Sequence, residues 1–282
     1  MKRIALVSCR EGLRLDEDLP PLVAALGSLG AAAEVVVWDD PAVAWAGYDL
    51  AVVRSAWDYA PRRDEFLAWA ERVSAATRLA NPAPVLRWNT DKRYLRELAE
   101  AGTPVVPTHW IAPGDPVRIP FDGQVVVKPA VSAGSIDTAR HAAAEPAAAH
   151  ARRIQASGRT VMVQPYLARL DEAGETGMVY MSGVFSHAFR KGPLLRTGAK
   201  PADGLFLPEE IRPREPSAAE RRLGNDLMAR HPGLLYARVD IAPGPDGGPL
   251  LLEFETTEPS LFFAAAPGSA ERFARAILRC PS

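Results

Sequence analysis

Short apolar runs alternate with amphipathic segments over residues 1–88. Three runs have the length and composition of buried strands, at residues 4–7, 34–38 and 49–53. Apolar residues recur with helical spacing over 19–29, and Gly30 is the expected C-cap of that helix. The same spacing recurs over 66–73. Strands separated by helices predict a parallel sheet. No Gly-x-Gly-x-x-Gly motif follows the first run, which excludes a dinucleotide-binding Rossmann half.

The rest of the chain predicts further strands and two hairpins. The strands are expected at 124–128 and 160–163, and the hairpins at 176–189 and 234–255. An Asp-Gly turn at 246–247 would place Asp240 opposite Glu253 across the second hairpin. The two-residue period of a strand then puts Glu253 and Glu255 on one face.

Length, composition and charge narrow the class of protein. At 282 residues, with 48% hydrophobic and 24% charged residues, the chain is globular and long enough for two or three packed domains. A net charge of -1 gives no general attraction to nucleic acid or an anionic membrane, and no apolar run reaches the ~20 residues of a membrane span. Two cysteines, Cys9 and Cys280, and a polar start without signal-peptide character predict a cytoplasmic protein.

Lysine is rare in this chain, which holds 28 arginines and five lysines among its 33 basic residues. Because a lysine ammonium is a compact charge that fits against phosphate oxygens, the retained lysines are candidates for anion contacts, with chance retention as the alternative. Lys92 is expected in the first turn of a helix from Asn89 to Gly102, where a bound anion best explains a cation that opposes the helix dipole. Lys128 closes a buried strand, and Lys191 lies at a basic loop tip after the first hairpin.

A loop of small residues follows the strand that ends in Lys128. It contains Ser132, Gly134 and Ser135, and its backbone N–H groups can approach phosphate oxygens because few side chains block them. The loop lacks the Gly-Lys-Ser/Thr of a Walker motif. We therefore predict a flap over phosphates, with a simple turn as the alternative.

The next strand runs into a segment that could bind the rest of a nucleotide. Gln164, Tyr166 and Leu167 form a strand-to-hinge segment that can offer backbone groups to an adenine edge. Glu172 or Glu175 follows at a distance where a carboxylate could hold ribose hydroxyls. The segment therefore predicts the adenosine end of the site.

Three carboxylates lie on strands of the second hairpin that are otherwise apolar enough to be buried. Asp240, Glu253 and Glu255 would repel one another there unless a divalent cation neutralised them. Oxygen-only ligands suit Mg²⁺, which also bridges ATP phosphates. An exposed acidic face explains Glu255 alone but not all three, so we predict a metal site.

Substrate contacts are expected where the third strand of the parallel sheet ends, because open parallel sheets bind ligands at that edge. Arg54 could grip a carboxylate there and Asp58 an amine, with a surface salt bridge as the alternative. Arg238, two residues before Asp240, could orient a carboxylate or neutralise an oxyanion, or act as counter-ion to the neighbouring glutamates. His187 could be a general base, although a structural histidine is the commoner outcome on an alternating strand.

In order and spacing these features resemble the ATP-grasp superfamily, in its glutathione-synthetase-like branch, over nearly the whole chain. The resemblance implies an α/β protein with α+β subdomains and an N-terminal parallel-sheet domain. The implied divisions are a substrate-side domain at 1–88, a central subdomain with the flap at 89–166 and a metal-binding subdomain at 167–282. It also implies that Lys92 and Lys128 contact the phosphates of ATP, with Lys128 near the adenine, and that two Mg²⁺ ions, or Mn²⁺, are bound. Two departures are Gln164, where many members have glutamate, and Glu255, where many have asparagine.

Three strings, at 54–59, 185–191 and 258–263, resemble the small ligases related to O-ureido-D-serine cyclo-ligase. This resemblance implies an ATP-dependent ligase that activates a small amino-acid carboxylate as an acyl phosphate, for attack by a nitrogen of the same molecule. Lys191 would help to spread the charge that develops. A bimolecular carboxylate–amine ligase and a nucleotide-binding module without turnover are the alternatives. The expected partners are a small amino-acid-like substrate and further copies of the chain, without nucleic acid or membrane.

Overall fold

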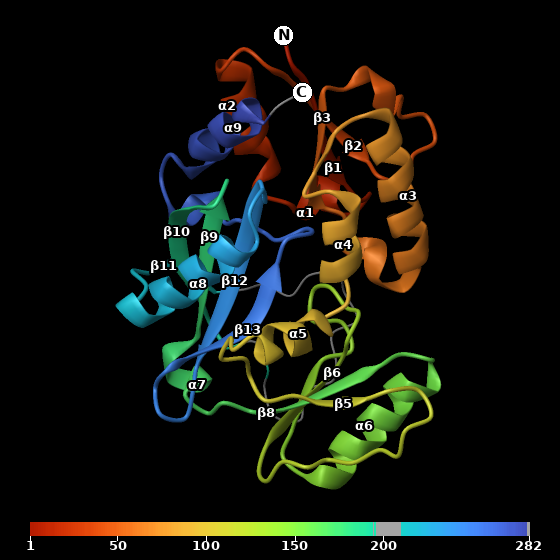
Figure 1. The fold of residues 1–282 in the computed structure, drawn as a ribbon, viewed down its shortest axis with the longest axis vertical. Helices are drawn as coiled ribbons and strands as arrows, with labels where there is room; N and C mark the ends of the chain where they lie inside the picture. Colours follow the sequence, from red (N-terminus) through yellow and green to blue (C-terminus); the bar gives the residue numbers. More distant parts are fainter. Residues whose placement is uncertain (194, 196–209, 281–282) are drawn as a thin grey trace.

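Three β-sheets organise the chain in a computed structural model that describes residues 1–193, 195 and 210–280 (Figure 1). The N-terminal sheet has the order β2-β1-β3-β4, and all its pairs are parallel, which confirms the predicted parallel sheet. Its strands are β1 (Arg3–Ser8), β2 (Ala32–Val37), β3 (Leu50–Ser55) and β4 (Leu79–Ala80). The connecting helices are α1 (Gly12–Leu15), α2 (Leu19–Ser28), η1 (Trp45–Gly47), η2 (Trp57–Arg62) and α3 (Arg63–Ala76).

A four-stranded antiparallel sheet follows, in the order β5-β8-β6-β7. Its strands are β5 (His109–Ile111), β6 (Val125–Pro129), β7 (Ala139–His141) and β8 (Val161–Pro165). The helices α4 (Ala83–Asn89) and α5 (Tyr94–Glu100) lead into it, and α6 (Ala144–Ala156) packs against one face. The strands predicted at 124–128 and 160–163 are confirmed as β6 and β8.

The third sheet is antiparallel, with the order β11-β10-β9-β12-β13. Its strands are β9 (Glu175–Met181), β10 (Val184–Lys191), β11 (Ile211–Pro213), β12 (Tyr236–Pro243) and β13 (Pro249–Glu255). Helices α7 (Leu170–Ala173), α8 (Ala218–Arg230), η3 (Phe263–Ala265) and α9 (Ser269–Arg279) accompany it. Both predicted hairpins are confirmed, and Asp240 pairs with Glu253 as expected. The two-residue Asp-Gly turn is wrong, because Pro243 pairs with Pro249 across a longer loop and the register shifts between Asp240 and Ile241.

One hydrophobic core joins the N-terminal sheet to the third sheet. Ile4 of β1 and Leu22 of α2 share this core with Tyr236 of β12 and Phe273 of α9, and α2 lies beside α9 (Figure 1). Asn81, directly after β4, adds a polar link, because its side-chain amide donates to the carbonyl of Tyr236 in β12 at 2.8 Å and to that of Thr256, just after β13, at 2.7 Å. In the described part of the chain, no helix is long and apolar enough to cross a membrane.

The helix predicted from Asn89 to Gly102 begins later than expected. Asn89 ends α4, and α5 starts at Tyr94, so Lys92 precedes the helix rather than lying in its first turn. The reason is that Asn89 is committed to the third sheet. The Asn89 side-chain NH2 donates to the Phe254 carbonyl, and the side-chain oxygen Oδ1 accepts the Thr256 N–H at 2.8 Å.

Candidate nucleotide and substrate site

A cavity of about 200 Å³ lies where the three sheets meet. Side chains from the N-terminal unit, from the β6–β8 sheet and from the third sheet all line it. Its described walls include most of the site residues predicted from the sequence: Lys92, Lys128, Ser132, Gly134, Ser135, Gln164, Tyr166, Leu167, Glu175, Lys191, Arg238, Asp240, Glu253 and Glu255. Residues as far apart in the sequence as Lys92 and Glu255 therefore form one site.

Two lysines converge on one glutamate at the β6 end of the cavity. The Lys128 ammonium lies 3.0 Å from Glu253 Oε1, and the Lys92 ammonium lies 3.8 Å from Glu253 Oε2. Burial raises the pKa of Glu253, but the charges on Lys92 and Lys128 outweigh burial and lower that pKa to about 2. The two lysines and the carboxylate thus form a charged triangle at the cavity wall.

The small-residue loop lies against this triangle. The Lys92 ammonium donates to the Ser132 carbonyl at 2.7 Å, which joins the loop to the lysine. Gly134 and Ser135 both have positive φ angles, of 59° and 62°, so the backbone turns sharply where it faces the cavity. This shape is compatible with the predicted phosphate flap.

The hinge segment enters the cavity at the end of β8. Gln164 is buried, and its amide donates to the Thr108 hydroxyl at 2.9 Å, so its side chain supports the neighbouring segment. The Tyr166 hydroxyl donates to Asp171 at 2.5 Å, and the Arg140 guanidinium stacks on the Tyr166 ring. Leu167 adds an apolar wall.

The structure separates the two glutamates considered for the ribose. Glu175 begins β9 and lines the cavity, where its carboxylate lies 3.3 Å from the Lys191 ammonium. Glu172 lies on the short helix α7, is exposed, and is not part of the cavity wall. Of the two, only Glu175 is in a position to contact a molecule in the cavity.

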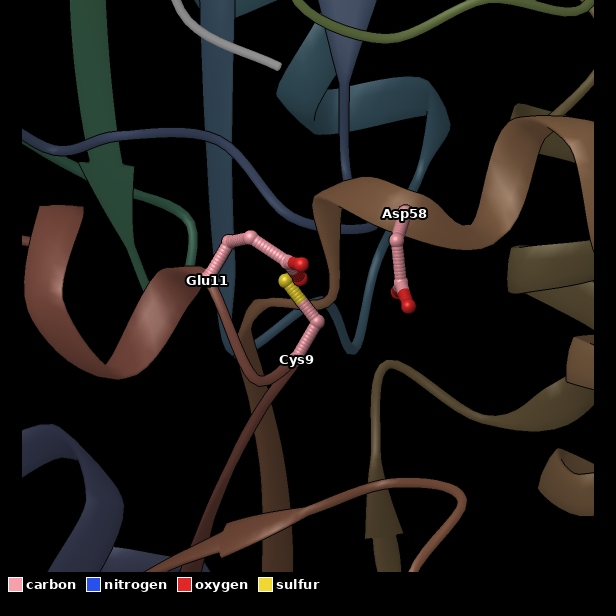
Figure 2. A group of neighbouring side chains, drawn as sticks. All are labelled: Cys9, Glu11 and Asp58. Carbon is pink, nitrogen blue, oxygen red and sulfur yellow. The ribbon is translucent and has the colours of Figure 1, made fainter. Parts of the chain in front are cut away.

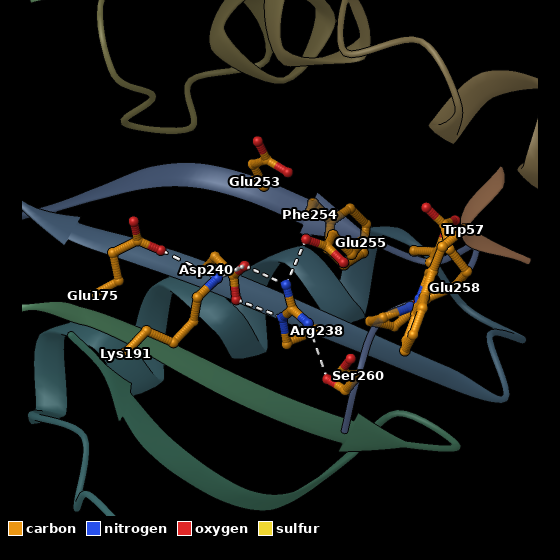
Figure 3. Close-up of polar contacts among 12 residues, drawn as sticks. Trp57, Glu175, Lys191, Arg238, Asp240, Glu253, Phe254, Glu255, Glu258 and Ser260 are labelled. Atoms are coloured by element: carbon orange, nitrogen blue, oxygen red, sulfur yellow. Dashed lines mark hydrogen bonds and ion pairs between the residues drawn. The ribbon is translucent and has the colours of Figure 1, made fainter. Parts of the chain in front are cut away.

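Lys191 does not lie at a loop tip, as the sequence led us to expect. It is the last residue of β10 and is buried, because its ammonium lies between two carboxylates, 3.3 Å from Glu175 and 3.2 Å from Asp240. The structure therefore places this lysine inside the site (Figure 3).

Arg238 is the counter-ion at the centre of the acidic hairpin (Figure 3). Its guanidinium contacts Asp240 through two nitrogens, each at 2.8 Å, and Glu255 at 2.5 Å. Burial raises the pKa of Asp240, but Arg238 and Lys191 together lower it below its usual value. Burial dominates at Glu255 and, with the charges of Asp240 and Glu253, raises the pKa of that carboxyl to about 7 against the opposing effect of Arg238.

The donor set of this hairpin fits Mg²⁺. Asp240, Glu253 and Glu255 offer only carboxylate oxygens to the cavity, which is the ligand chemistry that Mg²⁺ prefers. Among the described residues, their oxygens are not all gathered within 4.8 Å of one another. That spacing suits a magnesium ion that takes one or two carboxylates and completes its coordination with substrate phosphates and water.

Arg54 and Asp58 do not line the cavity. Arg54 is fully buried, and its Nη2 donates to the Pro259 carbonyl at 2.8 Å, because β3 ends beneath the segment that contains Pro259. Asp58 accepts from the Trp38 indole at 2.8 Å and from Arg62 at 2.7 Å. The structure therefore does not bring either residue into position for the predicted substrate contact.

Asp58 instead belongs to a cluster with Cys9 and Glu11, whose ligand atoms lie within 4.8 Å of one another (Figure 2). Both oxygens of Asp58 are already hydrogen-bonded within the protein, to Trp38 and Arg62. Burial raises the pKa of the Cys9 thiol, which disfavours the thiolate that a metal would need. This cluster is therefore a poor metal site.

His187 has a structural role. It is buried, with Nε2 2.7 Å from the Leu261 carbonyl oxygen and Nδ1 3.0 Å from the Ser186 hydroxyl. It is not part of the cavity wall. Burial lowers its pKa, so the neutral ring is the form that the fold favours.

Several cavity residues received no role from the sequence. Trp57 and Tyr59 come from η2, and Glu258 and Ser260 follow β13. The available signal was weak: Glu258 is a charged residue placed just beyond a strand that contains two cavity carboxylates. Nothing in the local pattern indicates which way the chain turns after Glu255.

Comparison with known proteins gives close relatives along the whole chain. Residues 4–81 match a family described as D-cycloserine synthetase DcsG, N-terminal domain. The sequence is 38% identical, over 294 aligned residues and 97% of each chain, to the cycloserine biosynthesis protein DcsG of Streptomyces lavendulae. The fold is similar to the crystal structure of D-cycloserine synthetase DcsG, with a TM-score of 0.87, 37% identity and 98% of each chain covered.

More distant structures share the fold alone. One is a RimK domain ATP-grasp protein from Sphaerobacter thermophilus, with a TM-score of 0.70, 18% identity, and 98% of this chain and 99% of that chain covered. Another is a D-alanine–D-alanine ligase from Bacillus anthracis, with a TM-score of 0.69, 14% identity, and 99% and 96% covered. The ATP-grasp fold expected from the sequence is confirmed. At 38% identity over nearly the whole of both chains, the protein belongs to the DcsG family, and it is an ATP-dependent ligase that forms C–N bonds.

Proposed function

We propose that the protein closes the isoxazolidinone ring of D-cycloserine from O-ureido-D-serine, with ATP as the phosphoryl donor. The observation that supports this proposal is the single cavity in which lysines, a small-residue loop and an acidic hairpin face one another. The relatives in the DcsG family, a cycloserine biosynthesis protein and a D-cycloserine synthetase, support the same product.

The proposed nucleotide contacts follow the cavity wall. Lys92 and Lys128 bind phosphate oxygens, and backbone N–H groups at Ser132, Gly134 and Ser135 cover them. The backbone of the hinge at 164–167, with Gln164, Tyr166 and Leu167, holds the adenine edge. Glu175 binds ribose hydroxyls. Its carboxylate shares the Lys191 ammonium with Asp240.

Asp240, Glu253 and Glu255 are the proposed residues for two Mg²⁺ ions, which Mn²⁺ could replace. The bound ions supply positive charge that stabilises the phosphates during transfer. Arg238 and the nearby lysines keep the three carboxylates in place while their negative charges are close together.

The reaction proceeds in two stages, followed by a hydrolysis. The substrate carboxylate attacks the γ-phosphorus of ATP, which gives an acyl phosphate and ADP. The oxygen-bound nitrogen of the ureido group then attacks the acyl carbon, loses its proton and expels phosphate, which closes the ring. The carbamoyl group left on that nitrogen is hydrolysed by one water to carbon dioxide and ammonia.

The protein's own part is positioning and charge balance. Lys191 and Lys92 offset the negative charge that develops in the first stage, and Arg238 neutralises the oxyanion of the second. Because the nitrogen and the acyl carbon belong to one molecule, holding the folded conformer already gives a high effective concentration. The site therefore has to exclude water from the acyl phosphate more than it has to recruit a second substrate.

Organisation beyond the site is also part of the proposal. The units at 1–88, 89–166 and 167–282 divide the work between substrate, phosphate flap and metal, and the active form is a cytoplasmic homo-oligomer. Light scattering during size-exclusion chromatography measures the number of copies, and a monomer at working concentration would remove that element of the proposal.

The test is phosphate release with Mg²⁺ and ATP over a panel of single amino acids, without added amine. Release with O-ureido-D-serine alone, together with D-cycloserine detected by mass spectrometry, is the expected result. Release that needs a separate amine would replace the proposal with a bimolecular ligase. The Asp240→Asn variant, which removes a proposed metal ligand, is the control for contaminating phosphatase activity.

A further inference from the structure

Glu258 differs from the other carboxylates that line the cavity. Asp240, Glu253, Glu255 and Glu175 each have a lysine or arginine nitrogen within 4.0 Å. Over residues 1–193, 195 and 210–280, Glu258 takes part in no ion pair within that distance. Burial has the largest effect on its pKa, and the charges of Lys92 and Arg238 oppose it from farther away. The cavity therefore contains one carboxylate that has no cation in direct contact among the described residues.

Aromatic side chains lie near this carboxylate. Glu258 lies beside the indole ring of Trp57 (Figure 3). Tyr59 also lines the cavity, and burial together with the charge of Glu258 raises the pKa of its hydroxyl. Burial, reinforced by the charge of Glu255, raises the pKa of Glu258 to about 8. A cation that enters this place is attracted by the carboxylate and also by the face of an indole ring.

The backbone around Glu258 is held rigidly. We call residues 258–263 the 258–263 loop. The Trp57 indole donates to the Glu258 carbonyl at 3.1 Å, and Arg54 donates to the Pro259 carbonyl at 2.8 Å. The carboxylate of Asp18 accepts three consecutive backbone N–H groups, from residues 261, 262 and 263, at 2.7 to 2.9 Å. The N-terminal unit thus fixes the place of the carboxylate before any ligand binds.

We propose that Glu258, with the aromatic wall formed by Trp57 and Tyr59, binds the α-ammonium group of the amino-acid substrate. This inference rests on the proposed function, in that the ligand is an amino acid whose carboxylate is activated by ATP. The site then selects substrates with a free primary ammonium and rejects deaminated or N-acylated analogues, because an uncharged or missing group leaves the Glu258 carboxylate without a partner.

The surroundings favour an organic ammonium over a metal ion. Glu258 lies three residues beyond Glu255, after the chain has left β13, and the indole ring of Trp57 lies beside it (Figure 3). Mg²⁺ requires six oxygen ligands in nearly octahedral positions, which an indole face does not supply. An ammonium group makes its hydrogen bonds to one carboxylate and places its C–H neighbours against the rings.

The experiment compares D-serine with 3-hydroxypropanoate, which has the same skeleton without the ammonium, and adds D-alanine and O-ureido-D-serine. Binding is measured by calorimetry with the intact protein, Mg²⁺ and a non-hydrolysable ATP analogue present. We expect the wild type to bind an amino acid at least about 10-fold more tightly than its deaminated analogue. In Glu258→Gln this preference disappears, while the affinity for the ATP analogue is unchanged.

The matched control is Glu145→Gln, which makes the same change at a side chain that is 82% exposed on α6. It should keep the wild-type preference. Glu258→Asp, which retains the charge, should recover part of it. An ammonium preference that survives in Glu258→Gln overturns the inference, as does equal binding of both analogues, or no binding of any amino acid, by the wild type.

Two other roles for Glu258 give different results. A general base would lower kcat in Glu258→Gln and leave KM for the amino acid unchanged, and a metal ligand would change the Mg²⁺ dependence; either result overturns the inference. No phosphate release with O-ureido-D-serine, combined with a Glu258-dependent ammonium preference, would instead remove the proposed substrate and keep the ammonium site.

Discussion

Arg238 holds Asp240 through a two-point contact, with Nε 2.8 Å from Oδ1 and Nη2 2.8 Å from Oδ2. The two residues lie two positions apart on β12, so both side chains project from the same face of the sheet. Arg238 also donates to the Ser260 carbonyl at 2.9 Å. This one arginine therefore connects the acidic hairpin to the 258–263 loop.

Asp240→Asn should damage both activity and stability. The substitution leaves Arg238 and Lys191 buried beside a neutral amide, and breaking a buried ion pair in this way costs on the order of 3 kcal/mol. It also removes a proposed metal ligand, so phosphate release should fall at least about 100-fold. Urea unfolding and a phosphate assay measure the two effects, with the exposed Asp226→Asn as control. Wild-type values for both would show that the pair is dispensable.

Lys128→Met should weaken ATP binding. Lys128 is buried at the end of β6, and a methionine of similar length keeps the packing but loses the charge. We expect kcat/KM for ATP to fall about 10-fold or more, which corresponds to one charged hydrogen bond to phosphate. Lys2→Met is the control, because Lys2 binds the Leu278 and Cys280 carbonyls instead of the cavity. An unchanged KM and kcat would exclude a phosphate contact at Lys128.

Arg54→Lys should raise KM for the amino acid without a matching change in KM for ATP. The lysine keeps the charge but not the planar guanidinium, which lies over the rings of Tyr236 and Phe273 while it holds Pro259. The 258–263 loop then shifts, and Glu258 and Ser260 shift with it. Steady-state kinetics with each substrate varied in turn gives the comparison. Ile277→Val, in the same core, controls for a general loss of stability, and equal effects on both KM values would argue against a positioning role.

The free energy of unfolding should decrease as the pH is lowered from 7 to 4.5, and His150 should account for part of that decrease. Burial, with the charge of nearby His141, lowers the pKa of His150 from 6.5 to about 4. Between those two values the unfolded chain binds more protons than the folded one, so the free energy of unfolding decreases as the pH falls through this window and is unaffected above it. The loss is on the order of 2–3 kcal/mol.

Urea unfolding of wild type and His150→Gln at pH 7.5 and pH 4.5 tests this expectation. The variant should lose less stability between the two pH values than the wild type does. His109→Gln, at a half-buried position on β5, is the control and should follow the wild type. Parallel pH curves for wild type and His150→Gln would mean that other groups cause the acid sensitivity.

Local patterns were sufficient for much of the architecture. Apolar runs separated by amphipathic helices predicted the parallel N-terminal sheet, which depends on the short-range rule of side-chain period. The pairing of Asp240 with Glu253 was also predicted correctly, but the turn was not: Pro243 pairs with Pro249 across a longer loop, and a register shift after Asp240 produces the pair. The cavity lysines were found through composition, since lysine stands out in a chain rich in arginine.

The errors concern residues whose partners are far away in the sequence. Asn89 has the character of a helix cap, but Phe254 and Thr256 engage its amide, so the helix starts later. The local sequence around Lys191 predicts an exposed loop, but the third sheet places Asp240 beside this lysine and buries it. Arg54 lies near the end of β3, at the expected ligand edge, but the 258–263 loop covers it. Contacts of this kind are set by how the units pack, which no local pattern records.

The core shared by the first and third sheets has a consequence for how the molecule unfolds. Ile4 and Leu22 on one side, and Tyr236 and Phe273 on the other, belong to one shared buried cluster. A fragment of residues 1–88 would expose its half of that surface to water and would aggregate rather than fold alone. The division of the chain into functional units therefore does not make them independent folding units, and heating should melt the first and third sheets together, in one cooperative transition.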